Sequence, residues 1–197
     1  MHQYTIDQTF DRIKTRHYLI VVGLPGQVVS EVEQYKSQFF ERFGYAEYVD
    51  SLAHISIARI VINEKYETQL IHNLTEALLS VEQFELEVSK FRVFINGPFK
   101  LLFLDVNQRP VANLHKVVNQ KIVLSFPVIE NYLKRMGHAH MTIAKIRDDQ
   151  QFEQSWEYFK NIDYNRQFKV HKIKILAKDS PLLKWSLLAN IPLAMAV

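Results

Sequence analysis

A seven-residue motif occurs twice in this chain, and it constrains the fold more than any other feature. Residues 54–60 read His-Ile-Ser-Ile-Ala-Arg-Ile, and residues 140–146 read His-Met-Thr-Ile-Ala-Lys-Ile. Four of the seven positions are identical, and the Ser/Thr and Arg/Lys pairs are chemically equivalent. Each copy has the composition of a β-strand and lies between two helical patterns. A duplicated unit is the simplest account, and it predicts two lobes related by a pseudo-two-fold axis.

The rest of the chain alternates strands and helices in the same way. Apolar residues at helical spacing predict helices within 32–43, 70–81, 114–122 and 152–159, and β-rich runs predict strands at 18–22, 84–95, 99–106, 168–177 and 184–189. This order predicts an α+β fold. We expect a single domain over residues 1–197, with pseudo-repeats at roughly 16–95 and 99–190.

Composition narrows the class of protein. A chain of 197 residues suits one compact domain, and the absence of cysteine excludes disulfides, thiolate nucleophiles and thiolate metal sites. No stretch approaches the ~20 apolar residues of a membrane helix, and the first residues do not resemble a signal peptide. We therefore expect a soluble, cytoplasmic protein with no membrane partner. The net charge of +3 permits a phosphate-bearing partner without requiring one.

Strand alternation predicts which side chains the motif presents. In a regular strand His54, Ser56 and Ala58 share one face, and Arg59 lies on the other. The second copy alternates in the same way, so Lys145 is expected on the face opposite His140. If the lobes face each other, two imidazoles and two hydroxyls converge in one cleft. Arg59 and Lys145 are then expected to be structural, unless the strand bulges.

This set of groups suits attack on a phosphodiester without a metal. A neutral histidine can take a proton from the attacking hydroxyl or water, and a protonated histidine can give one to the leaving oxygen. The hydroxyls of Ser56 and Thr142 can donate hydrogen bonds to the non-bridging phosphoryl oxygens, where charge develops.

The motif pair also resembles a known family. His54-Ile55-Ser56-Ile57 and His140-Met141-Thr142-Ile143 match the paired H-x-[ST]-x motifs of the two-histidine (2H) phosphoesterase superfamily, at a spacing similar to that of its 2′-5′ RNA ligase-like branch. The segments 16–25, 97–106 and 185–193 resemble that branch as well, so the likeness covers the chain from about residue 16 onward.

The resemblance implies a bilobed fold in which the antiparallel sheet of each lobe lines a central cleft, with helices packed outside. It implies hydrolysis of 2′,3′-cyclic phosphates on RNA ends or nucleotides, and in some members reversible 2′-5′ ligation. By this likeness His54 and His140 are the catalytic acid/base pair, and Ser56 and Thr142 bind phosphate. No metal and no other cofactor are implied.

Four further residues are candidate substrate contacts, each with a structural alternative. Tyr18 and Phe99 could stack on a base or lie in the core. Lys172 and Lys174 share one face of a late strand, where they could contact an RNA backbone or simply be solvated. The sequence His138-Ala139-His140 could suggest a metal pair, but no carboxylate partner is evident in the sequence.

Two other interpretations remain open. The same cleft could hold RNA ends or a nucleotide without turnover, as a non-catalytic binding module. Alternatively, the repeat could be coincidental within a different α+β fold. The sequence does not distinguish tRNA, an oligonucleotide, a mononucleotide or an ADP-ribose derivative as the substrate, nor does it fix which histidine is the acid or the oligomeric state.

Overall fold

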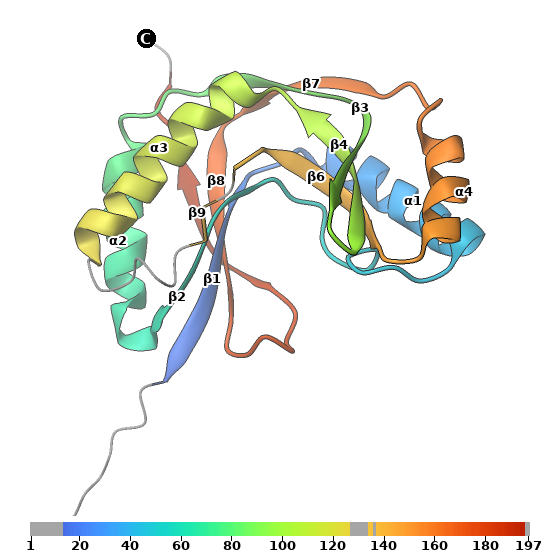
Figure 1. The fold of residues 1–197 in the computed structure, drawn as a ribbon. Coiled ribbons are helices and arrows are strands. Elements are labelled where there is room, and N and C mark those ends of the chain that lie inside the picture. The colour runs from blue at the N-terminus through green and yellow to red at the C-terminus, as the bar shows by residue number, and fades with distance from the viewer. Residues whose placement is uncertain (1–13, 127–133, 136, 196–197) are drawn as a thin grey trace, which may run out of the picture.

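The structure, a computed structural model, describes residues 14–126, 134–135 and 137–195 and contains two antiparallel β-sheets covered by helices (Figure 1). The sheets, here called sheet A and sheet B, form two lobes. Strand β2 (Ser56–Asn63) carries the first motif from Ser56 onward in sheet A, with His54 just before it, and β6 (His140–Ile146) carries the second motif in sheet B. The expected two-lobed α+β fold is confirmed.

Each sheet places its motif strand beside a strand from the same half of the chain. Sheet A has the order β5-β2-β1-β8-β9, and sheet B has the order β6-β4-β3-β7. All neighbouring pairs are antiparallel. The bounds of the other strands are β1 (Thr15–Val22), β3 (Phe84–Asn96), β4 (Phe99–Val106), β5 (Lys134–Arg135), β7 (Asn165–Val170), β8 (Lys172–Lys178) and β9 (Ser186–Pro192).

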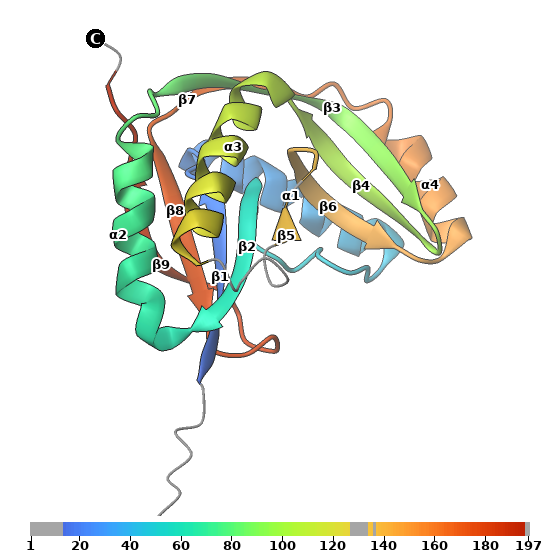
Figure 2. The same cartoon turned by 60° about the vertical axis from the view of Figure 1, so that its left-hand side comes forward.

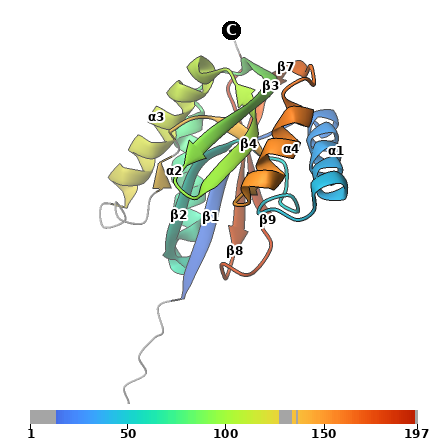
Figure 3. The same ribbon diagram turned by 45° about the vertical axis from the view of Figure 1, so that its right-hand side comes forward.

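The α-helices within the described residues cover one side of each sheet, and two of them cross between the lobes. α2 (Glu67–Leu78) and α3 (Gln108–Ser125) pack on sheet A (Figure 2), whereas α1 (Gly26–Phe43) and α4 (Asp149–Phe159) pack side by side on sheet B (Figure 3). α1 thus leaves β1 of sheet A to pack on β6, and α3 leaves β4 of sheet B to pack on β2. Each lobe is completed by a helix from the other half of the chain.

The helices form where the sequence carries apolar residues every three or four positions. Leu70, Leu74 and Leu78 of α2 are fully buried in this way. α1 ends at Gly44, whose φ of 82° lies in the left-handed region that glycine adopts without strain. None of the helices in the described ranges is both long and apolar enough to cross a membrane.

Each sheet has a helix-covered face and an open face. In β1 the buried Tyr18 and Ile20 point towards the helices and join the main core. Their neighbours Leu19 and Val21 point the other way, onto the open face of sheet A, and form a small separate cluster with Leu176. The open faces therefore carry whatever side chains the motif strands direct away from the core.

The expected strand over 168–177 is wrong, because the structure has two strands there. β7 ends at Val170 and pairs with β3 in sheet B, whereas β8 begins at Lys172 and pairs with β1 in sheet A. The chain changes sheets at His171, whose Nδ1 lies 2.9 Å from Oε1 of Gln83. No glycine or proline marks this change, so the β-rich pattern continues through it.

Candidate active site

The two motif histidines are held in the same way. Nδ1 of His54 lies 2.7 Å from the carbonyl oxygen of Leu52, and Nδ1 of His140 lies 2.7 Å from the carbonyl oxygen of His138. A carbonyl only accepts, so each neutral ring carries its proton on Nδ1 and leaves the lone pair of Nε2 free. In both neutral rings, Nε2 can therefore accept a proton without a change of tautomer.

The histidines also lie close enough to affect each other. A proton on His140 lowers the pKa of His54 through charge repulsion, although burial is the larger cause of that lowering. Burial also lowers the pKa of His140. The pKa values of both imidazoles are therefore lowered, and a proton on one ring disfavours a proton on the other. This fits a site in which one histidine is neutral while the other is protonated.

A β-bulge in each motif strand decides which residues share the open face. In β2 the register against β1 shifts, so Val21 pairs with Ser56 while Leu19 pairs with Arg59. Ser56 and Arg59 therefore project from the same face of sheet A. Ile57 is the additional residue, and like Ala58 it is buried.

The second motif has the same irregularity. Phe103 of β4 pairs with Thr142, and Leu101 pairs with Lys145, so Ile143 is the additional residue. The expectation that Arg59 and Lys145 point away from the motif hydroxyls is therefore wrong. Strand alternation holds only between bulges, and each bulge returns the cation to the hydroxyl's face.

The segment before His54 is held by a buried lysine. Lys36 of α1 is 2% exposed, and its ammonium donates to the carbonyl oxygens of Tyr48 (2.9 Å) and Ser51 (2.7 Å) and to the Ser51 hydroxyl (2.8 Å). Burial lowers the pKa of Lys36 to about 8. Its charge also lowers the pKa of His54. Lys36 thus both positions this segment and opposes protonation of the histidine.

The segment before His140 is held differently, by an amide and a carboxylate. Gln108 accepts from the backbone N–H of Ala139 (2.8 Å) and donates to its carbonyl (2.9 Å). Asp105 lies 3.0 Å from Nε2 of His138. Burial and the charge of His138 lower the pKa of His140, and the charge of Asp105 raises it. The charged neighbours of the two histidines therefore differ: only a cation, Lys36, acts on His54 besides the partner histidine, whereas both His138 and the carboxylate of Asp105 act on His140.

Two phenylalanines pack against His140 on the open face of sheet B. The rings of Phe94 and Phe103 stack with centroids 4.4 Å apart, and Phe103 lies 5.3 Å from the His140 ring. Phe94 is 5.9 Å from the same ring. These aromatic side chains fix the plane of the imidazole and reduce its access to water.

The four candidate substrate contacts have different positions. Tyr18 is fully buried on the helix-covered face and donates to Glu67 (3.1 Å). Burial and the charge of Glu67 raise its pKa. Of the two roles expected for Tyr18, the structure supports the one in the core. Phe99 lies under the ammonium of Lys145, 4.6 Å from its ring centroid. Lys172 and Lys174 alternate with buried isoleucines and project from the open face of sheet A, where Lys174 pairs with Val21.

Several residues of this arrangement were not anticipated from the sequence. These residues contact the histidines or the segments before them and are not part of the repeated motif. They are Lys36, Phe94, Phe103, Asp105 and Gln108. His138, considered above as half of a metal pair, contacts Asp105 instead. Within the described ranges no group of three or more metal-ligating side chains is assembled.

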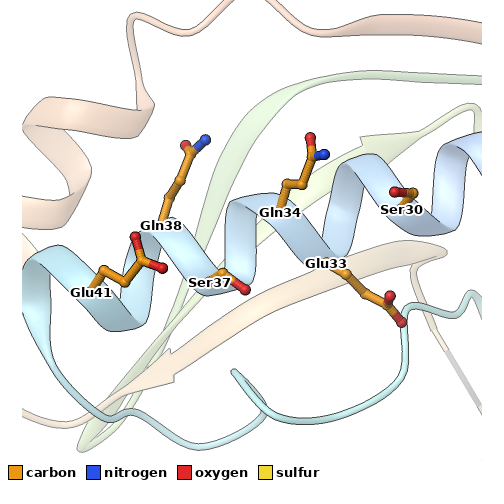
Figure 4. Close-up of a pocket in the computed structure, with 6 residues that line it drawn as sticks. All are labelled: Ser30, Glu33, Gln34, Ser37, Gln38 and Glu41. Atoms are coloured by element: carbon orange, nitrogen blue, oxygen red, sulfur yellow. The ribbon is translucent and has the colours of Figure 1, made fainter.

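Two surface hollows lie apart from the motif residues. One is lined only by polar residues on one side of α1, among them Ser30 and Glu41 (Figure 4). The other, of about 830 Å³, lies between β3 and α4 and is lined in part by Phe152 and Trp156. Neither is lined by a motif histidine or hydroxyl.

Comparison with known proteins agrees with the motif pair. The sequence profile of the 2′-5′ RNA ligase superfamily matches residues 24–181. No protein with a curated description matches the sequence.

Solved structures share the fold at low sequence identity. E. coli LigT complexed with 3′-AMP is 14% identical with a TM-score of 0.68, and the match covers 91% of this chain and 98% of LigT. The protein TT0787 of Thermus thermophilus is 11% identical with a TM-score of 0.66, over 90% and 97% of the two chains. Kluyveromyces marxianus Usb1 is 14% identical with a TM-score of 0.50, over 92% and 99%.

Proposed function

The chain belongs to the 2′-5′ RNA ligase superfamily, and from this membership we propose that it is a phosphoesterase that opens 2′,3′-cyclic phosphates on RNA ends or nucleotides without a metal. One observation carries the proposal. Both motif histidines donate Nδ1–H to a backbone carbonyl, so both keep Nε2 for proton transfer. The ligands named in the crystal structures of LigT, which include 3′-AMP, ATP and NADP⁺, support a nucleotide as the class of ligand.

The charges beside the two histidines support a division of roles. Lys36 opposes protonation of His54, so His54 is the base: its Nε2 takes a proton from water as the water oxygen attacks phosphorus. A carboxylate, Asp105, raises the pKa of His140 and no carboxylate acts on His54, so we assign His140 as the acid: it gives a proton to O3′ as the P–O3′ bond breaks. The product is a 2′-phosphate, and the two histidines have exchanged protonation states.

The hydroxyls of Ser56 and Thr142 supply the electrostatic part of the mechanism. Each projects from the open face of its sheet, one from each lobe. We assign them to the two non-bridging oxygens of the phosphoryl group, whose negative charge increases in the transition state. Ligation uses the same groups: a 5′-hydroxyl takes the place of water, and the new bond is a 2′-5′ phosphodiester.

The decisive experiment is hydrolysis of the four nucleoside 2′,3′-cyclic phosphates in EDTA. We expect turnover by the wild-type protein and its loss, by a factor of about 10²–10⁴ or more, in His54→Ala and His140→Ala. His72→Ala is the matched control, because His72 is an exposed histidine on α2. Wild-type rates in both motif variants would overturn the mechanism. Binding of an RNA with a cyclic phosphate end, without turnover, would instead support a non-catalytic binding module.

A further inference from the structure

Two cationic side chains contact the ring of one tryptophan on the open face of sheet A. The guanidinium of Arg59 lies 5.8 Å from the ring centroid of Trp185, and the ammonium of Lys178 lies 4.7 Å from it. Trp185 packs on the open-face cluster of Leu19, Val21 and Leu176. We call Arg59, Lys178, Trp185 and the neighbouring His17 the Trp185 patch. The ring holds both cations over the face that carries Ser56.

The positive charge of this patch is not balanced within the described part of the chain. Burial is the largest cause of the lowered pKa of His17, and the charges of Arg59 and Lys178 lower it further. Burial and Arg59 also lower the pKa of Lys178. No described carboxylate contributes to either group, and Asp179 pairs with Arg16 at 2.7 Å. Like charges held together in this way favour an anionic ligand.

The equivalent cation of the other lobe provides an internal comparison. Lys145 occupies the position of Arg59 in the second motif, and its ammonium lies 2.7 Å from the carboxylate of Glu47. Lys145 is therefore neutralised within the chain. Nδ1 of His17, in contrast, is buried without a hydrogen-bond partner beside two cations. Of the two motif cations, the one in sheet A therefore has no carboxylate partner among the described residues, which fits binding of an external anion.

The strand register fixes the distance between this patch and the phosphate-binding hydroxyl. Ser56 pairs with Val21, Arg59 with Leu19, and Lys178 with His17. At about 3.4 Å per residue, Arg59 lies one row, or roughly 7 Å, from Ser56 along the strand direction. Lys178 lies two rows, or roughly 14 Å, along the same direction and also two strands across the sheet. The spacing between Ser56 and Arg59 suits a second phosphate attached to the same nucleotide.

We infer that the Trp185 patch is a second phosphate subsite, which binds the 5′-phosphate of the nucleotide whose 2′,3′-cyclic phosphate is opened. The inference rests on the proposed function for the identity of the first site. It selects the substrate class: 5′-phosphorylated nucleotides and RNA 3′ ends, whose terminal nucleotide carries a 5′ phosphodiester, are preferred over nucleosides that carry only the cyclic phosphate.

Calorimetric binding of two product-like ligands tests this without turnover. We expect adenosine 2′,5′-bisphosphate to bind the wild-type protein about 10-fold more tightly than adenosine 2′-phosphate, the least that a charge-assisted hydrogen bond supplies. In Arg59→Gln the ratio of the two dissociation constants should fall to about one. Lys116→Gln, which replaces an exposed lysine of α3, should keep the wild-type ratio.

Lys178→Gln serves as the second variant, with thermal unfolding measured for all proteins to identify folding defects. A wild-type ratio of one would overturn the subsite, and so would an unchanged ratio in both Arg59→Gln and Lys178→Gln. Turnover of the cyclic phosphates is scored separately. If the cyclic phosphates are turned over but the ratio of dissociation constants is one, only the subsite is rejected. If that ratio is near ten but there is no turnover, only the catalytic proposal is rejected.

Discussion

At the scale of single residues, the different charges beside the two histidines make the pH profile informative. The base must be neutral and the acid protonated, so the rate should rise above the pKa of His54 and fall above that of His140. Because burial lowers both pKa values, we expect the optimum of kcat/KM below about pH 6.5, the unperturbed value for histidine.

Lys36→Met should change one limb of that profile. Removing the cation removes an interaction that lowers the pKa of His54, so the acidic limb should move to higher pH. The alkaline limb, which reports on His140, should stay in place. The measurement is kcat/KM against pH, with Lys65→Met as the surface-lysine control. Movement of the alkaline limb instead would reverse the assignment of base and acid.

The two hydroxyls lead to a graded prediction. Ser56→Ala and Thr142→Ala should each lower kcat/KM by roughly 10- to 100-fold, because a hydrogen bond to a charged group is worth about 1.5–3 kcal/mol. The loss should appear mainly in kcat if the bond strengthens in the transition state. Steady-state kinetics with Ser186→Ala, a hydroxyl residue of β9, as the control would test this. A loss confined to KM would indicate ground-state binding only.

The sequence was sufficient to identify the residues proposed to carry the chemistry, and insufficient for those that position them. His54, Ser56, His140 and Thr142 stand out because their types and order repeat. Lys36 and Gln108 do not repeat, since the two lobes support their histidines with different groups. A buried lysine on an otherwise apolar helix stripe is ambiguous in sequence, because a lysine can equally reach solvent from such a position.

At the scale of elements, the first turn of α3 is joined to the start of β6. Gln108, the first residue of that helix, bonds both backbone groups of Ala139. Gln108→Leu leaves these groups without a partner and should lower the free energy of unfolding by about 1–3 kcal/mol. It should also reduce kcat by displacing His140. Chemical denaturation and kinetics measure the two effects, and Gln120→Leu, a substitution on the same helix away from Ala139, is the control.

The elements themselves followed from periodicity, but their pairing did not. Helical spacing located each α-helix of the described residues, whereas nothing local distinguished the two strands in 165–178. The bulges at Ile57 and Ile143 are also invisible in sequence, because a bulge is a relation between two strands. That relation placed Arg59 on the open face and made the Trp185 patch visible.

At the scale of the whole molecule, the continuous core predicts cooperative unfolding. One buried cluster contains residues of both sheets, including Ile20 of β1 and Ile143 of β6. The chain has two tryptophans, Trp156 on α4 beside sheet B and Trp185 on sheet A. In Trp156→Phe and Trp185→Phe the remaining tryptophan reports on one lobe. We expect the fluorescence transition of each variant in urea to coincide with its own circular-dichroism transition. A lobe that unfolds separately would show two midpoints within one variant.

The crossing of α1 and α3 has a consequence for how such a chain could have arisen. In a unit made only of β1, α1, β2 and α2, the apolar face of α1 would be exposed to solvent, because that helix packs on the other sheet. Two copies of the unit could each lend this helix to the other and bury both stripes, as in a domain-swapped dimer. In those terms the present fold has the arrangement of an exchanged pair joined into one polypeptide, with one of the two proposed catalytic histidines in each half.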